Sequence, residues 1–149
     1  MATRQPLSLK GRALRLLGNR EHSRAELERK LAPHEAAPGD LARVLDELEA
    51  KGFIREERVV ESVLHRRAGK LGAGRIRQEL QAKGLDAELI SQAMQQLRAT
   101  ETDRARAVWQ RKFGEPPRDA AQRARQSRFL AARGFGGDAI RRVLGGGDD

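Results

Sequence analysis

The sequence predicts an all-α protein, an elongated solenoid of three tandem three-helix repeats. Residues 74–90 align without a gap with residues 124–140, so one segment recurs after fifty positions. Apolar residues recur at helical spacing, and no segment shows the sustained apolar–polar alternation of a half-buried strand. All five prolines fall outside the expected helices, where a residue without a backbone N–H costs little. Because one three-helix unit cannot bury its own apolar face, such a chain stacks several units.

We expect the repeats at residues 9–52, 53–99 and 100–144, between an N-terminal tail at 1–8 and a flexible tail at 145–149. The middle and last repeats match most clearly, and the first joins the pattern through a shift of forty-nine residues that places Leu31 on Leu80. The pairs that relate the middle and last repeats are Arg75 with Arg125, Leu80 with Leu130, Ala82 with Ala132, Lys83 with Arg133, Gly84 with Gly134, Leu85 with Phe135 and Ile90 with Ile140.

The first repeat has recognisable helix starts. Ser8 is expected to cap the first helix, and Ser23 the second. Glu26 lies three residues after Ser23, the spacing of a capping box in which each side chain accepts the other's backbone N–H. Leucines and a valine at i, i+3, i+4 and i+7 predict a third helix over residues 41–48, which ends at Gly52.

Helices of the other two repeats follow from the same spacing. In the middle repeat the first helix breaks between Gly69 and Gly74, and the second stops at Gly84, a typical left-handed C-cap. The apolar faces of the middle repeat are Val59, Val60, Val63 and Leu64, then Ile76 and Leu80, then Ile90, Ala93, Met94 and Leu97. Those of the last repeat are Ala105, Val108, Trp109 and Phe113, then Ala124, Ser127, Leu130 and Ala131, then Ile140, Val143 and Leu144.

The chain is basic, and the excess of positive charge grows along it. Its 149 residues carry a net charge of +9, with ten bases and eight acids in residues 1–51 but eleven bases and seven acids in residues 100–149. Such a charge favours a polyanionic partner, either nucleic acid or an acidic protein surface. There is no cysteine and no apolar run of membrane-spanning length, so we expect a cytoplasmic protein.

The sequence contains no recognisable active site. His22, His34 and His65 are scattered without carboxylates at ligand spacing, and we expect them at the surface or at helix caps. The glycine-rich run at residues 72–74 lacks a preceding strand and a Walker lysine, so it is a weak phosphate-binding signal. We therefore expect no enzyme activity, no cofactor and no metal.

Basic residues on the repeated helices are the strongest functional signal. Residues 65–83 and 123–142 are each rich in Arg and Lys and contain a single acid. Their repeat relationship predicts a basic stripe that suits an extended polyanion or a protein filament better than a small substrate. The candidate interaction residues are Arg66, Arg67, Lys70, Arg75, Arg77, Lys83, Arg123, Arg125, Arg128 and Arg133.

The same segments carry a family resemblance. The runs KGFIREERVV and GRIRQELQAKGL in the middle repeat and ARQSRFLAARGF in the last are similar to the RecX family, the regulatory proteins of the RecA recombinase. The runs AELERKL and LDELEAKGFI of the first repeat fit as well, and the resemblance covers residues 9–144.

The resemblance implies three three-helix repeats in a curved monomer that binds RecA, chiefly as the filament on single-stranded DNA. Members of the family typically limit filament growth or promote disassembly, in DNA repair and the SOS response. They thereby reduce strand exchange, ATP hydrolysis and co-protease action, and some also contact DNA.

Two other classes of function remain open at this point. One is a helical DNA-binding protein or repressor that does not act through RecA, since the segment from Ser23 to Ile54 resembles a helix-turn-helix. Against it, the linker is long, the would-be recognition helix at 41–50 is rich in acids, and no wing strands are expected. The other is an RNA-binding or scaffold solenoid.

Overall fold

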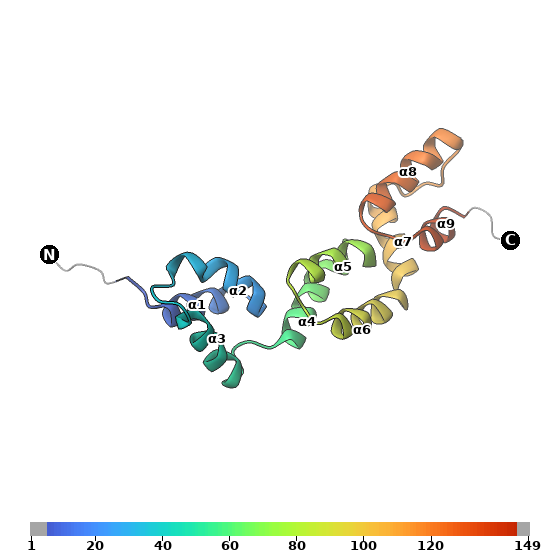
Figure 1. Ribbon diagram of the computed structural model, residues 1–149. Helices are drawn as coiled ribbons and strands as arrows, with labels where there is room; N and C mark the ends of the chain where they lie inside the picture. Colours follow the sequence, from blue (N-terminus) through green and yellow to red (C-terminus); the bar gives the residue numbers. More distant parts are fainter. Residues whose placement is uncertain (1–5, 146–149) are drawn as a thin grey trace. The chain divides into compact units, whose positions relative to one another are not determined.

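The computed structural model describes residues 6–145, and within this range every regular element is a helix (Figure 1). The all-α prediction is confirmed, and the helices form three consecutive groups of three. The elongated arrangement and the repeat boundaries stay predictions, and most of the predicted tails, residues 1–5 and 146–149, lies outside the described residues. The elements are α1 (Leu9–Asn19), α2 (Arg24–Leu31), η1 (Ala32–His34), α3 (Asp40–Ala50), α4 (Glu56–Arg67), α5 (Ala73–Ala82), α6 (Ala87–Arg98), α7 (Glu101–Lys112), α8 (Ala120–Ala132) and α9 (Gly137–Leu144).

The chain divides into two compact units, which are described separately. The first unit runs to Val59 and includes the short segment Lys83–Leu85. The second unit holds Val60–Ala82 and the chain from Asp86 onward.

Both predicted caps of the first unit are confirmed. The Ser8 hydroxyl accepts a hydrogen bond from the Gly11 backbone N–H at 3.0 Å. The Ser23 hydroxyl accepts from the Glu26 N–H at 3.1 Å while the Glu26 carboxylate accepts from the Ser23 N–H at 3.0 Å, which completes the capping box. The core beneath these helices contains Leu27, Leu45 and Leu48, all fully buried.

The end of the chain has its own core, in which a polar residue replaces two predicted apolar ones. The sequence pattern predicts Ala124 and Ala131 on the buried face of α8, and both are exposed. Gln126 is buried instead, because its carbonyl accepts the Trp109 indole N–H at 2.8 Å and its amide donates to the Glu115 carbonyl at 3.1 Å. A buried Trp needs such an acceptor, and this requirement outweighs the apolar periodicity of α8.

Two glycine turns make equivalent contacts. Gly84 and Gly134 follow α5 and α8 with φ of 70° and 93°, the left-handed conformation predicted for Gly84. In the second unit, the Gly72 N–H donates to the Arg133 carbonyl at 2.7 Å, and the Gly74 N–H donates to the Gly134 carbonyl at 3.0 Å. The turn at Gly134 therefore meets the first turn of α5, the second helix of the preceding repeat.

The first unit makes the same kind of contact through a side chain. There the Ser23 hydroxyl donates to the Lys83 carbonyl at 2.6 Å, in place of the Gly72 N–H. The segment Lys83–Leu85 lies so close to α2 that a Cβ on Gly84 would be 2.8 Å from the Ala25 Cβ. The positions equivalent to Ser23 and Ala25 in the middle repeat are Gly72 and Gly74. The sequence places Gly74 in the break before the helix, whereas the structure has it inside α5, where its N–H takes part in this contact.

An ion pair holds several chain segments of the second unit together. The Glu101 carboxylate accepts from the backbone N–H groups of Ala73 and Gly136, both at 3.2 Å. Arg104, paired with Glu101 at 2.7 Å, donates to the carbonyls of Ala68 at 3.0 Å and Leu71 at 2.8 Å. The start of α5, the loop before it and the start of α9 are thus bound to one turn of α7.

Truncation of the equivalent leucines tests the packing of these cores. Leu80 and Leu130 are both fully buried, so Leu→Ala at either is expected to lower the free energy of unfolding by about 2–5 kcal/mol, measured by urea denaturation. Leu7 is 45% exposed, and its truncation serves as the control, with a change within about 0.5 kcal/mol. Losses no larger than the control at both sites would contradict the assignment of these leucines to the core.

Adding a methyl group at Gly72 tests the glycine turn. A Cβ there would lie 2.3 Å from the Gly134 carbonyl carbon and 2.3 Å from the Phe135 nitrogen, so backbone must move. Gly72→Ala is expected to cost on the order of 3 kcal/mol of unfolding free energy. Gly18→Ala is the matched control, because nothing lies within 4 Å of that position in α1 and alanine favours a helix. Equal stability of the two variants would show that the turn tolerates a side chain.

Candidate interaction surfaces

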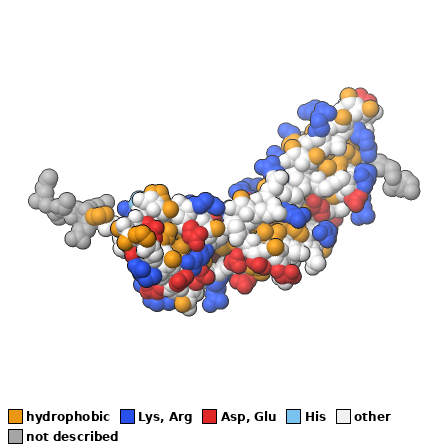
Figure 2. Space-filling view, in the orientation of Figure 1, with side chains coloured by type: hydrophobic (Ala, Val, Ile, Leu, Met, Phe, Trp, Pro, Cys, Tyr) orange, Lys and Arg blue, Asp and Glu red, His pale blue; other side chains and the backbone are white. Residues whose placement is uncertain are grey.

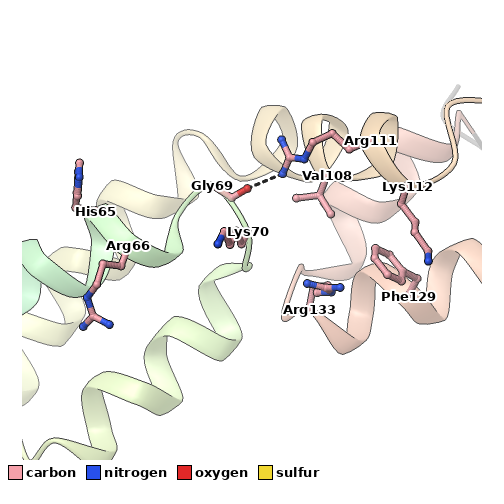
Figure 3. Close-up of a pocket in the computed structure, with 9 residues that line it drawn as sticks. All are labelled: His65, Arg66, Gly69, Lys70, Val108, Arg111, Lys112, Phe129 and Arg133. Atoms are coloured by element: carbon pink, nitrogen blue, oxygen red, sulfur yellow. Dashed lines mark hydrogen bonds between the residues drawn. The ribbon is translucent and has the colours of Figure 1, made fainter.

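A concave site in the second unit, here called the basic groove, gathers positive charge (Figure 3). Its volume is about 570 Å³, and five of its lining side chains are Arg or Lys, with no acid among them. The lining residues as a whole come from the C-terminal parts of α4, α7 and α8 and from the residues that follow α4 and α8. The groove is lined by His65, Arg66, Gly69, Lys70, Val108, Arg111, Lys112, Phe129 and Arg133.

The positive charge of the groove exceeds what the helices require. Three helix C-termini lie here, and each carries about −0.5 elementary charge that a cation in the last turn stabilises. They account for about −1.5 charges in all, whereas the five side chains bring five positive charges. Most of the positive charge of the groove therefore remains after the helix dipoles are satisfied.

Phe129 holds two of these cations in place. The Arg133 guanidinium carbon lies 4.8 Å from the Phe129 ring centroid, and the Lys112 ammonium lies 5.3 Å from it. The ring is fixed in turn by an edge-to-face contact with Phe113, with centroids 5.4 Å apart. On the other side of the groove, Arg111 donates to the Gly69 carbonyl at 2.8 Å. These contacts orient the side chains without using a carboxylate.

Three of the sequence-predicted residues lie in the groove, namely Arg66, Lys70 and Arg133. Arg67 is next to it and pairs with Glu79 at 3.0 Å, and Arg66 is 3.8 Å from the same carboxylate. The other functional side chains of the lining are not predicted from the sequence. For two of them, the sequence signal is the pair of cations that ends α7. The hairpin of α7 and α8 brings this pair to the end of α4. The missed residues are His65, Arg111, Lys112 and Phe129.

Four further predicted residues lie on exposed faces of α5 and α8 and are here called the outer arginines: Arg75, Arg77, Arg125 and Arg128. Arg75 donates to the Ala132 carbonyl at 2.8 Å, and Arg125 lies 5.8 Å from the Phe113 ring centroid. Arg77 and Arg128 form no ion pair within residues 6–145. Figure 2 shows Lys and Arg side chains prominent around α7 and α8.

Two predicted residues have structural roles. Lys83 is 8% exposed and pairs with the Glu26 carboxylate at 3.2 Å, so its ammonium is bound within the protein. Arg123 is half-buried and donates to the Leu144 carbonyl at 3.5 Å. Lys83 and Arg133 match in the sequence, yet only Arg133 is exposed. We therefore leave Lys83 and Arg123 out of the interaction surface.

The Glu26 carboxylate is the centre of a buried polar network. Burial alone would raise the pKa of Glu26, but hydrogen bonds from Arg20, the Ser23 N–H and Lys83 outweigh it and lower this pKa to about 2. His22 is buried beside this network rather than at the surface, and burial lowers its pKa. Its Nδ1 lies 3.0 Å from the Arg20 carbonyl and its Nε2 lies 3.1 Å from the Lys30 ammonium, which corresponds to a neutral imidazole.

Within residues 6–145 no group of three or more acidic or histidine side chains is arranged to hold a metal ion. None of the helices in that range is long and apolar enough to cross a membrane.

Comparison with known proteins decides the family. Family models for the first, second and third three-helix domains of RecX match residues 10–48, 56–94 and 99–144. The chain belongs to the RecX family. These ranges correspond to α1–α3, α4–α6 and α7–α9, so the family's three domains coincide with the three helix groups.

Individual RecX proteins agree in length and fold. The Regulatory protein RecX of Leptothrix cholodnii is 57% identical over 97% of this chain and 92% of its own, and that of Ralstonia nicotianae is 49% identical over 97% and 91%. The crystal structure of RecX from Lactobacillus salivarius is similar with a TM-score of 0.74 at 18% identity, over 92% of each chain. At that identity the likeness concerns the fold.

The low pKa of Glu26 predicts acid sensitivity of the first unit. A carboxyl whose pKa falls from 4.5 to about 2 on folding contributes about 3 kcal/mol above the unfolded pKa, and this contribution is lost as pH falls through the folded pKa. Unfolding free energies measured from pH 6 to about pH 2 should therefore fall less steeply for Glu26→Gln than for the parent. The exposed Glu57→Gln is the control. A Glu26→Gln profile parallel to that of the parent would contradict the network.

Proposed function

We propose that this chain binds the RecA recombinase, chiefly as its filament on single-stranded DNA, and restrains ATP hydrolysis, strand exchange and co-protease action. The observation that carries the proposal is membership of the RecX family through all three domains. The near-complete coverage of curated relatives named as regulatory proteins supports a regulatory role. The protein would act as a monomer in the cytoplasm.

The outer arginines are the surface proposed to contact the recombinase. A guanidinium stays charged at all physiological pH values and can bind a carboxylate through two parallel hydrogen bonds. Arg77 and Arg128 are exposed and form no ion pair within the described range, so binding a partner would break no internal contact. Arg77 lies on α5 and Arg128 on α8, so the two charges come from successive repeats, at positions one residue out of the fifty-residue register.

Restraint follows from binding two protomers at once. A ligand shifts a conformational equilibrium only by its difference in affinity for the states involved. A helical protein that contacts adjacent protomers binds best at one protomer spacing, and it therefore opposes any step of the filament cycle that changes this spacing.

Charge reversal at the two unpaired outer arginines tests the proposal. The Arg77→Glu/Arg128→Glu variant is expected to need about tenfold more protein for half-inhibition of RecA ATP hydrolysis on single-stranded DNA. Each exposed pair is worth on the order of 1 kcal/mol, and reversal adds repulsion. The control is Arg15→Glu/Arg98→Glu, which changes the net charge equally at two exposed positions of α1 and α6.

Helicity and melting should be unchanged in both variants. Inhibition by the Arg77→Glu/Arg128→Glu variant at the level of the control would exclude these arginines as the interface. Failure of the parent protein to bind RecA filaments in a pull-down with single-stranded DNA and ATP would overturn the proposed function itself.

A further inference from the structure

Three helices of the chain end in the same way, with a basic residue, a glycine and an apolar residue. The three endings are Lys51-Gly52-Phe53 after α3, Lys83-Gly84-Leu85 after α5 and Arg133-Gly134-Phe135 after α8. Each glycine is left-handed, with φ of 82°, 70° and 93°. The apolar residue is buried in two of these turns, since Leu85 is 7% exposed and Phe135 is 4% exposed. Phe53 is 46% exposed, so the third turn presents an aromatic ring that the fold does not cover.

The backbone on both sides of Phe53 is fixed. The Phe53 N–H donates to the Leu48 carbonyl at 2.8 Å. The Gly52 N–H donates to the Glu49 carbonyl at 3.0 Å, which completes a Schellman motif. Leu48 is fully buried, and Ile54 is 6% exposed in the same core. Because Ile54 takes the inward position, the ring before it is left in solvent on a backbone that is already ordered, and covering it with a partner costs little conformational entropy.

Arg55 lies on the same turn, and its charge is unpaired. A Cβ on Gly52 would be 3.1 Å from an Arg55 guanidinium nitrogen, so the guanidinium lies against the turn. Arg55 is exposed and forms no ion pair within residues 6–145. Arg58, in contrast, donates to the Gly52 carbonyl at 2.7 Å and pairs with Glu21 at 2.8 Å, which holds the start of α4 on the turn. Aromatic residues and arginine are the types that contribute most to the affinity of protein interfaces.

The charges around Phe53 favour a protein partner over a nucleic acid. Residues 46–57 carry five acids and two bases, so this segment does not attract a phosphate backbone. The acids at the end of α3 are bound within the first unit by Arg24, Lys10 and Lys51. Arg55 is thus a cation at the turn with no carboxylate of its own. The turn fits a protein surface that has an apolar pocket with a carboxylate beside it.

We propose that Phe53 and Arg55, here called the turn anchor, dock the first unit on a protomer of the recombinase, with the ring in an apolar pocket and the guanidinium on an adjacent carboxylate. The inference rests on the proposed function for the identity of the partner. It adds a contact in the first repeat, which carries none of the outer arginines. The two contacts also differ in chemistry, because raised salt screens exposed charges but does not weaken the burial of an apolar ring.

The test is truncation of the ring, Phe53→Ala, in the full-length chain. Half-inhibition of RecA ATP hydrolysis on single-stranded DNA is expected to need about thirtyfold more protein, the effect of losing a hot-spot residue. Arg55→Ala should cost about threefold, as expected for one exposed ion pair. The matched control is Leu7→Ala, since Leu7 is 45% exposed in the same unit, and its effect should stay within about twofold. Helicity and melting should be unchanged in all three variants, and Phe53→Leu should recover part of the inhibition.

Three outcomes would overturn the turn anchor and leave the proposed function standing. The first is inhibition by Phe53→Ala at the level of the Leu7→Ala control. The second is weaker binding of Phe53→Ala to a dye-labelled oligothymidylate without recombinase, which would mean that the ring contacts nucleic acid. The third is self-association of the parent in sedimentation velocity that Phe53→Ala abolishes, because the ring would then bind a second copy of the chain. Failure of the parent itself to bind RecA filaments would overturn the proposed function, and this result is seen before any variant is compared.

Discussion

The contact between a glycine turn and the first turn of a neighbouring helix is the constraint on which the rest of the structure depends. A helix N-terminus leaves backbone N–H groups without partners, and the carbonyls of residues 133 and 134 accept two of them. A left-handed glycine is needed to aim those carbonyls. The contact recurs at Lys83, where the Ser23 hydroxyl is the donor. In both contacts a carbonyl of the turn accepts a hydrogen bond at the start of the helix, from backbone N–H groups in one and from a side-chain hydroxyl in the other.

Contacts at the glycine turns also decide which basic side chains pair within the fold and which are left exposed. A basic residue beside a glycine turn can be drawn into the contact, as Lys83 is by Glu26. Its counterpart Arg133 contributes only its backbone carbonyl to the turn, and its side chain is left to the groove. The difference arises from the repeat that precedes each turn. The repeat before Lys83 has Glu26, whereas the repeat before Arg133 has Arg75 at the equivalent position. A match between repeats in sequence is therefore not a match in role.

Much of the fold could be predicted from the sequence, because caps and left-handed glycines act locally. Ser8, Ser23 and Gly84 were identified from their immediate neighbours alone. The buried amide of Gln126 could not be, since it depends on an indole that is seventeen residues away. The basic groove could not be predicted from the sequence for a similar reason. Its cations come from the ends of α4 and α7 and from the residues that follow α4 and α8, and only the tertiary fold shows that these three helix ends meet.

The Glu101 carboxylate has a consequence for how the second unit opens. It accepts hydrogen bonds from Ala73 and Gly136, at the starts of two helices sixty-three residues apart. Local fraying at either helix start would leave the carboxylate with one partner fewer in a poorly solvated position. The two amide protons are therefore coupled, and their exchange with solvent should follow one shared opening event rather than two independent ones. Through this side chain, α5 and α9 belong to one cooperative unit.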